Sequence, residues 1–96
     1  MGRVTKASLE HAAQGINLLL GTPVEPWGPK GSRPGSHYVY RDAAVWALER
    51  MENEKGATNR ILQGETKSEL LSLMLAFSDG ILAGRVKRLI QFTESE

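Results

Sequence analysis

The chain has 96 residues, with 12 Lys and Arg against 11 Asp and Glu, so its net charge is near +1. This balance excludes the strongly basic composition of a dedicated nucleic-acid-binding domain, and the length allows one domain with a modest core. Because the chain has no cysteine, a disulfide scaffold, a thiolate metal site and a cysteine nucleophile are also excluded.

The first predicted element is a helix over residues 5–20. Thr5 has a hydroxyl that can accept a hydrogen bond from a free N–H group of the first turn. Gly21 follows the last apolar residue, where a left-handed backbone position favours glycine. Between these caps, apolar residues recur at three- and four-residue spacing and form one stripe, which comprises Leu9, Ala12, Ala13, Ile16, Leu19 and Leu20.

A Pro/Gly-rich loop is predicted over residues 21–36. This segment holds all four prolines of the chain and four of its ten glycines. Such a segment in a small domain is usually either functional or disordered, so it is the first place to look for function. Trp27 is its most informative residue, because tryptophan is common at binding hot spots. The alternative for Trp27 is an anchor that folds back onto the domain.

The middle of the chain fits two structures. Residues 36–41 follow a two-residue alternation of side-chain types and are rich in aromatic and β-branched side chains, which is typical of a strand. Residues 42–51 fit either a second strand or a helix with Asp42 as N-cap, and residues 58–62 fit a returning strand. Because a lone strand would leave its backbone groups unpaired, the sequence favours a three-stranded antiparallel meander. A mostly α fold with a helix at residues 42–54 is the alternative.

The last predicted element is a second helix that begins at Thr66. Thr66 and Glu69 have the spacing of a capping box, in which each side chain bonds the other residue's N–H group. Asp79 and Gly80 can loosen or end this helix; if it continues, Val86, Leu89 and Ile90 carry on an apolar face. Residues 84–96 are expected to form a basic amphipathic extension. The apolar stripe of the helix comprises Leu70, Leu73, Met74, Phe77 and Ile81.

Together these elements predict a single α+β domain over residues 1–96. Its order is an N-terminal helix, the long Pro/Gly loop, a three-stranded antiparallel sheet and a C-terminal helix. An aromatic set from Tyr38, Tyr40 and Trp46 is expected on the sheet face that packs on the helices. No run approaches the roughly 18 apolar residues of a transmembrane helix, so no membrane partner is expected.

Three short segments carry a resemblance to known proteins. The sequence INLLLGTP closes the first helix at residues 16–23, TKSEL opens the second at residues 66–70, and AFSDGI follows at residues 76–81. With the Gly-rich loop that leads to an aromatic strand, this pattern resembles a group of small bacteriophage-encoded proteins of unassigned function. The resemblance implies a helix, a small sheet and a helix in a phage or prophage accessory protein, located in the cytoplasm of the bacterial host cell. It implies no catalytic residue.

No residue pattern indicates an enzyme. His11 and His37 are the only histidines, and neither has the spacing of a zinc or catalytic metal site. Ser36, His37 and Asp42 are residue types of a hydrolytic triad, but no tight nucleophile turn accompanies them. The glycines of the loop lead into a strand rather than a helix, which excludes a phosphate-binding P-loop. We therefore predict no enzymatic activity, no metal and no cofactor.

The predicted function is that of a small binding protein that occludes a surface of a host or viral protein. The partner-binding residues are predicted to be Trp27, Arg33, Tyr38, Arg85, Arg88 and Leu89. The aromatic residues would supply apolar contact area and the arginines would orient the partner. Two alternatives stay open. The apolar face of residues 81–92 can pack on a second copy in a structural homodimer, or the basic residues and aromatics can bind nucleic acid.

Overall fold

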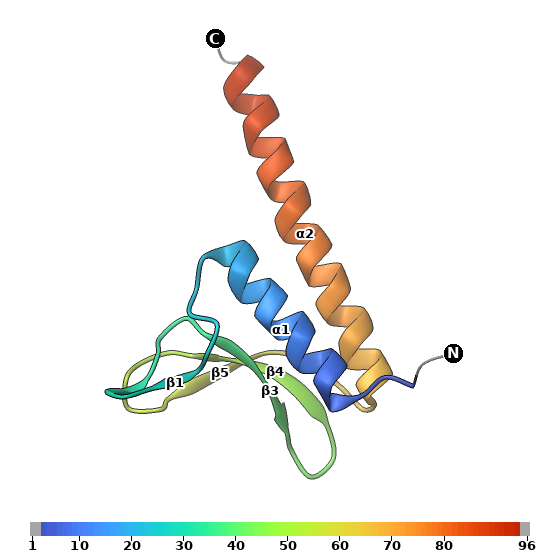
Figure 1. Cartoon of the computed structure of the whole chain (residues 1–96). Helices are drawn as coiled ribbons and strands as arrows, with labels where there is room; N and C mark the ends of the chain where they lie inside the picture. Colours follow the sequence, from blue (N-terminus) through green and yellow to red (C-terminus); the bar gives the residue numbers. More distant parts are fainter. Residues whose placement is uncertain (1–2, 95–96) are drawn as a thin grey trace.

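The structure, a computed structural model, describes the backbone of residues 3–94 and the side chains of residues 3–84. It confirms the predicted α+β fold (Figure 1). The alternative helix at residues 42–54 is wrong, because the middle of that segment, Trp46–Met51, is a strand and no part of it is helical. The elements in chain order are α1 (Lys6–Leu20), β1 (Trp27–Gly28), β2 (Gly31–Ser32), β3 (His37–Arg41), β4 (Trp46–Met51), β5 (Thr58–Gly64) and α2 (Lys67–Glu94).

The caps of α1 are those that the sequence predicts. The Oγ1 atom of Thr5 accepts a hydrogen bond from the N–H of Ser8 at 3.1 Å. The hydroxyl of Ser8 lies 3.4 Å from the N–H of Thr5 and accepts from it. Gly21 ends the helix in the left-handed region, at φ 72°. Both ends of α1 are thus fixed by local hydrogen bonds and backbone geometry.

The start of α2 differs in one detail from a reciprocal capping box. Thr66 accepts from the N–H of Glu69 at 3.1 Å, as predicted. The carboxylate of Glu69, however, accepts from the N–H of Glu65 at 2.9 Å, one residue before the expected donor. Of the two outcomes that the sequence left open at Gly80, the structure shows the second: the helix continues to Glu94. Glycine in a helix interior costs only about 0.5–1 kcal/mol relative to alanine, which continued helical hydrogen bonding offsets.

The three-stranded sheet has the order β3-β4-β5, with both pairs antiparallel. α1 packs over β3 and α2 over β5, so the two helices lie side by side on one face of the sheet (Figure 1). The core lies between these two layers. Its buried residues are Leu9, Ala13 and Ile16 of α1, Leu48 of β4, and Leu70 and Met74 of α2.

Strand alternation places the aromatic residues on different faces. Val39 pairs with Leu48 and packs against the core, so both face the helices. Because successive side chains point to opposite faces, Tyr38 and Tyr40 face away from the helices. Of the aromatic set expected on the inner face, only Trp46 packs against the core.

A β-bulge in β5 sets which side chains face outward. Leu62 pairs with Leu48, whereas Arg60 pairs with Glu49, so Ile61 has no opposite residue of its own. Ile61 and Leu62 both pack against the core, although they are consecutive. The extra residue thus restores Arg60 to the outer face, opposite Glu49.

Within residues 21–36, for which the sequence predicts only a loop, residues 27–32 form a short two-stranded ribbon. β1 and β2 pair antiparallel, with Trp27 opposite Ser32. The Oγ atom of Ser32 donates to the carbonyl of Asn53 at 2.6 Å, which ties the ribbon to the turn between β4 and β5. Gly31 has φ 115°, and an added Cβ there would lie 2.9 Å from the carbonyl oxygen of Glu54. Glycine is therefore required at this contact for both reasons.

α2 extends well beyond the sheet. Ile81 is the last of its described side chains that packs against the core, and the helix backbone continues to Glu94 (Figure 1). The radius of gyration is accordingly 15.1 Å, against roughly 12.5 Å for a compact domain of this length. Among the described residues, no helix combines the length and apolar character needed to cross a membrane.

Candidate peptide-binding edge

Asn17 joins α1 to the first residue of β3. Its side chain is fully buried; its Oδ1 atom accepts from the N–H of His37 at 2.7 Å, and its Nδ2 atom donates to the carbonyl of His37 at 2.9 Å. A residue of a neighbouring strand would make the same two bonds. The hydroxyl of Thr22 also donates to Oδ1, at 2.8 Å. The amide group of Asn17 thus takes the place of a fourth strand at His37.

Asn17 was not among the functional residues predicted from the sequence. It follows Ala13 by four residues and Leu9 by eight, which places a polar side chain on the buried stripe of α1. A buried polar side chain needs hydrogen-bond partners, so its position on the stripe was the available signal. The partner, His37, lies 20 residues later in the chain.

The imidazole of His37 is buried and uncharged at neutral pH. Its Nδ1 atom lies 3.1 Å from Oδ1 of Asn17, and its ring centroid lies 6.4 Å from that of Phe77. Burial lowers the pKa of His37 from its ordinary value of 6.5, and the positive charge of Arg50 lowers this pKa further. Since Oδ1 can only accept, Nδ1 carries the proton of the neutral ring.

The lowered pKa of His37 predicts a loss of stability in mild acid. Below pH 6.5 the unfolded chain binds a proton at this residue before the folded chain does, so the free energy of unfolding decreases as the pH falls. The slope is at most about 1.4 kcal/mol per pH unit from this group. Urea unfolding between pH 7 and 5.5 measures it. The decrease in the free energy of unfolding per pH unit should be smaller in His37→Gln than in the parent protein. It should be unchanged in His11→Gln, the exposed control. Equal decreases in the parent protein and both variants would contradict this assignment.

β3 is an edge strand, and the ladder to β4 shows which of its backbone groups are free. Met51 donates to the carbonyl of Ser36 at 2.9 Å, and Asp42 and Val45 exchange both backbone bonds at 2.9 and 3.2 Å. Antiparallel pairing alternates, so every second residue between Ser36 and Asp42 bonds to β4. The N–H and C=O groups of Val39 and Arg41 therefore point away from β4. Among the described residues, no hydrogen bond satisfies them on that side.

A groove lies beside this edge, and we call it the edge groove. It encloses about 240 Å³ and is formed by α1, the connection that follows α1, and β3. Its lining residues are Glu10, Gln14, Val24, Glu25, Pro26, His37, Tyr38 and Val39. The lining has two carboxylates and no Lys or Arg, so the groove is acidic.

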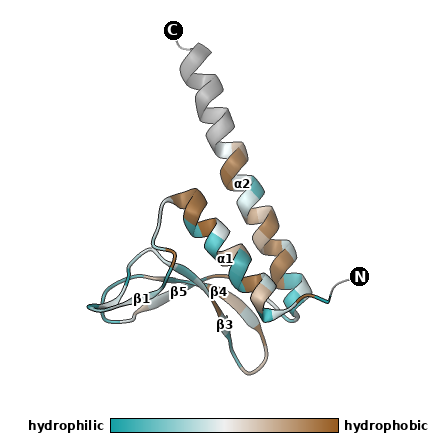
Figure 2. Cartoon of the chain, viewed as in Figure 1, coloured by the Kyte–Doolittle hydropathy of each residue, from teal (hydrophilic) through white to brown (hydrophobic). Residues whose placement is uncertain are grey.

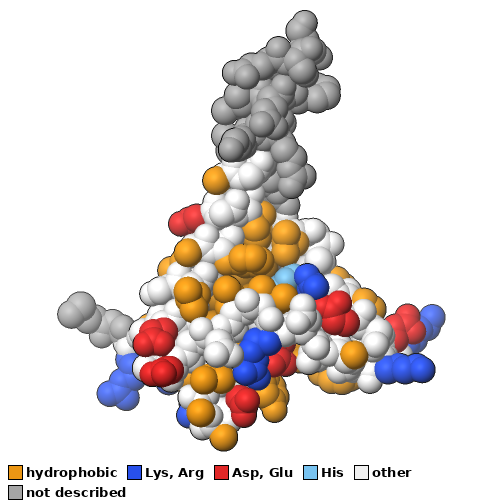
Figure 3. All heavy atoms as spheres, turned by 180° about the vertical axis from the view of Figure 1, so that it is seen from behind, with side chains coloured by type: hydrophobic (Ala, Val, Ile, Leu, Met, Phe, Trp, Pro, Cys, Tyr) orange, Lys and Arg blue, Asp and Glu red, His pale blue; other side chains and the backbone are white. Residues whose placement is uncertain are grey.

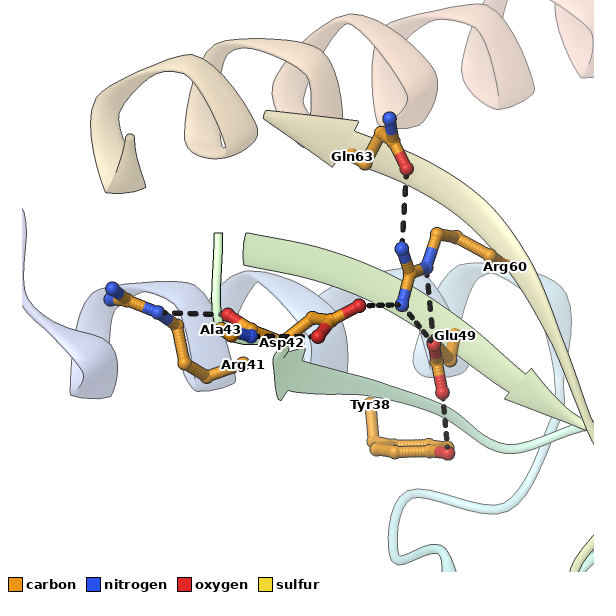
Figure 4. Close-up of polar contacts among 7 residues, drawn as sticks. All are labelled: Tyr38, Arg41, Asp42, Ala43, Glu49, Arg60 and Gln63. Atoms are coloured by element: carbon orange, nitrogen blue, oxygen red, sulfur yellow. Dashed lines mark hydrogen bonds and ion pairs between the residues drawn. The ribbon is translucent and has the colours of Figure 1, made fainter. Parts of the chain in front are cut away.

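A polar network covers the opposite face of the sheet (Figure 4). The hydroxyl of Tyr38 donates to Glu49 at 3.0 Å, and two guanidinium nitrogens of Arg60 lie 3.2 Å from the other carboxylate oxygen. Arg60 also reaches Asp42 at 3.5 Å. Burial and the bond to Glu49 raise the pKa of Tyr38 to about 12. The carboxylate of Glu49 has partners on both oxygens, so this network links the three strands.

The predicted partner-binding residues do not gather in one place. Trp27 is 60% exposed, and the edge of its ring lies near Gly56 in the turn between β4 and β5, so it both rests on the fold and exposes a surface. The guanidinium of Arg33 lies against Gly28 within the ribbon. Tyr38 lies on the outer face of the sheet with its hydroxyl bonded to Glu49. The side chains of Arg85, Arg88 and Leu89 lie outside the described residues.

Comparison of the chain with known protein families, with curated proteins and with solved structures finds no match. Within the part of the chain that the structure describes, no three His, Asp or Glu side chains gather in an arrangement that could hold a metal ion.

Proposed function

We propose that the chain is a small non-enzymatic protein-binding module that occludes a surface of its partner, as a phage accessory protein acting on a host or viral protein would. The observation that carries this proposal is the apolar surface that α2 leaves uncovered. Leu70 and Met74 of α2 are fully buried, but Leu75 is 54% exposed and Leu82 is 46% exposed. A helix with apolar residues on more than one side is usually buried on more than one side.

The end of α1 also exposes apolar side chains. Leu18 is 71% exposed, and Leu20 is also exposed. Hydrophobic residues lie at the end of α1 and along the described part of α2 (Figure 2). Seen from behind, hydrophobic side chains gather along α2 where it rises from the rest of the fold (Figure 3). Extended apolar surfaces on small proteins usually mark an interaction site.

The polar groups of the fold support binding rather than catalysis. The hydroxyl of Tyr38 and the carboxylate of Glu49 are bonded to each other, and His37 is bonded to Asn17. The Tyr38–Glu49 pair lies on the outer face of the sheet, whereas His37 faces the helices, so the three groups do not converge. Trp27, exposed on a ribbon that is tied to the sheet, supplies a further rigid apolar contact.

Glutamate substitutions on α2 test the proposal. We expect Leu75→Glu and Leu82→Glu to reduce the binding of partner protein from bacterial lysate at least tenfold, because each buries a charge in the interface. Both should keep the melting temperature of the parent protein, since the side chains are exposed. Ser72→Glu, on an exposed position of the same helix, is the matched control and should bind normally. Unchanged binding by both leucine variants would contradict the proposed surface.

Light scattering over a range of concentrations separates a partner protein from a second copy. A monomeric mass with leucine-dependent capture supports the proposal. A dimer that Leu82→Glu converts to a monomer would instead favour the structural homo-oligomer. Binding to a labelled oligonucleotide that decreases steeply with salt would favour the nucleic-acid alternative.

A further inference from the structure

The backbone groups on the free edge of β3 need hydrogen-bond partners, and among the described residues only those of His37 have one. One side-chain amide, from Asn17, satisfies both outward groups of His37. The next two outward-facing residues, Val39 and Arg41, present two N–H and two C=O groups in the same row. An unpaired row of this kind is a template for another strand.

α1 runs beside this row and forms the second wall of the edge groove. Gln14 and Glu10 precede Asn17 by three and seven residues, so they lie on the same side of the helix. Asn17 is bonded to His37, while Gln14 and Glu10 line the groove with Val39. A strand added to β3 would therefore lie between the sheet edge and α1, with every second side chain directed into the groove.

We propose that the edge groove binds an extended peptide of a partner protein, which adds a fourth strand to β3. This inference goes beyond the proposed function, because it assigns a second binding site and the chemistry of its ligand. The acidic lining selects a peptide that directs a Lys or Arg side chain toward Glu10 and Glu25. Val24 and Val39 favour an apolar residue two positions from that cation. Backbone bonds supply affinity and these two side chains supply specificity.

The charges disfavour a second copy of the chain at this edge. Pairing of β3 with its own equivalent would bring the Glu10 and Glu25 carboxylates of both chains to one interface. Lys6 lies 3.8 Å from Glu10, but both of these side chains are largely exposed, so their pairing compensates little. A cationic peptide meets the same carboxylates with opposite charge.

Two synthetic peptides test the site: acetyl-Thr-Val-Thr-Lys-Thr-amide and the same peptide with Glu in place of Lys. Each is titrated to millimolar concentration into the isotope-labelled full chain, and backbone amide signals are followed by NMR. We expect the Lys peptide to shift the amide signals of Val39 and Arg41 most and to bind about fivefold more tightly than the Glu peptide, as one exposed ion pair provides. The absence of shifts at Val39 and Arg41 with both peptides would overturn the proposal.

Charge-reversal variants test the selectivity. Glu10→Lys combined with Glu25→Lys should reverse the preference between the two peptides, whereas Glu65→Lys, an exposed glutamate outside the edge groove, should leave it unchanged. An unchanged preference in the double variant would overturn the assigned peptide chemistry. A dimer that protects the Val39 amide without peptide would show that a second copy occupies the edge. Because Leu75 and Leu82 are outside the groove, their variants should bind the peptides normally, so this site and the α2 surface can fail independently.

Discussion

Replacing Asn17 with alanine is expected to lower the free energy of unfolding by about 3 kcal/mol or more. The substitution leaves the N–H and C=O of His37 without their partners in a buried position, and each unsatisfied buried group costs about 1–3 kcal/mol. It also removes the acceptor of the Thr22 hydroxyl. Equilibrium unfolding in urea, followed by circular dichroism, measures the loss.

Gln14→Ala is the matched control for Asn17→Ala. Gln14 lies one turn earlier on α1 and is exposed, so its truncation should change the free energy of unfolding by less than about 0.5 kcal/mol. A loss below about 1 kcal/mol in Asn17→Ala would show that water or a rearranged backbone replaces the amide bonds. The attachment of α1 to β3 would then depend on apolar packing alone.

The same substitution at two glycines should have opposite effects. Gly64 ends β5 where α2 begins, and an added Cβ would lie 2.8 Å from the backbone nitrogen of Leu70 and 2.9 Å from Cβ of Glu69. Because the nearest atom belongs to the backbone of a helix, relief requires a shift of β5 against α2. We expect Gly64→Ala to destabilise the protein by about 1–3 kcal/mol, the usual cost of overpacking.

Gly80 provides the contrast. It lies in the interior of α2, and apart from the adjoining residues and the backbone of its own helix, no atom lies within 4 Å of an added Cβ. Gly80→Ala should therefore stabilise the protein by about 0.5–1 kcal/mol through the better helix propensity of alanine. Melting temperatures of the two variants, measured side by side, check the sign of each effect. Destabilisation by Gly80→Ala would contradict a continuous, uncovered helix at this position.

The features that the sequence predicted correctly are local ones. Thr5 begins α1 and Gly21 ends it through contacts within a few residues, and Thr66 begins α2 in the same way. The meander followed from alternation and from the need of a strand at residues 36–41 for partners. In each case the residues that decide the structure are close together in the chain or share a simple period.

The structural features that the sequence did not predict depend on residues far apart in the chain. Ser32 meets Asn53 across 21 residues, and this contact orders a segment that reads as a loop. The bulge at Ile61 depends on how β5 aligns with β4 and cannot be inferred from β5 alone. The edge groove has the same origin, since it combines residues of α1, the following connection and β3. Of the predicted partner-binding residues whose side chains the structure describes, only Tyr38 lines the groove.

Amide hydrogen exchange in the peptide-free protein tests most directly whether the edge of β3 is open. The structure predicts slow exchange for Tyr38 and Tyr40, whose N–H groups face β4, and for His37, which is bonded to Asn17. Val39 lies between the two tyrosines and Arg41 follows Tyr40. Both should exchange orders of magnitude faster, since their N–H groups face the open edge. Protection of Val39 equal to that of Tyr38 would mean that the edge is already paired, and would contradict an available binding site there.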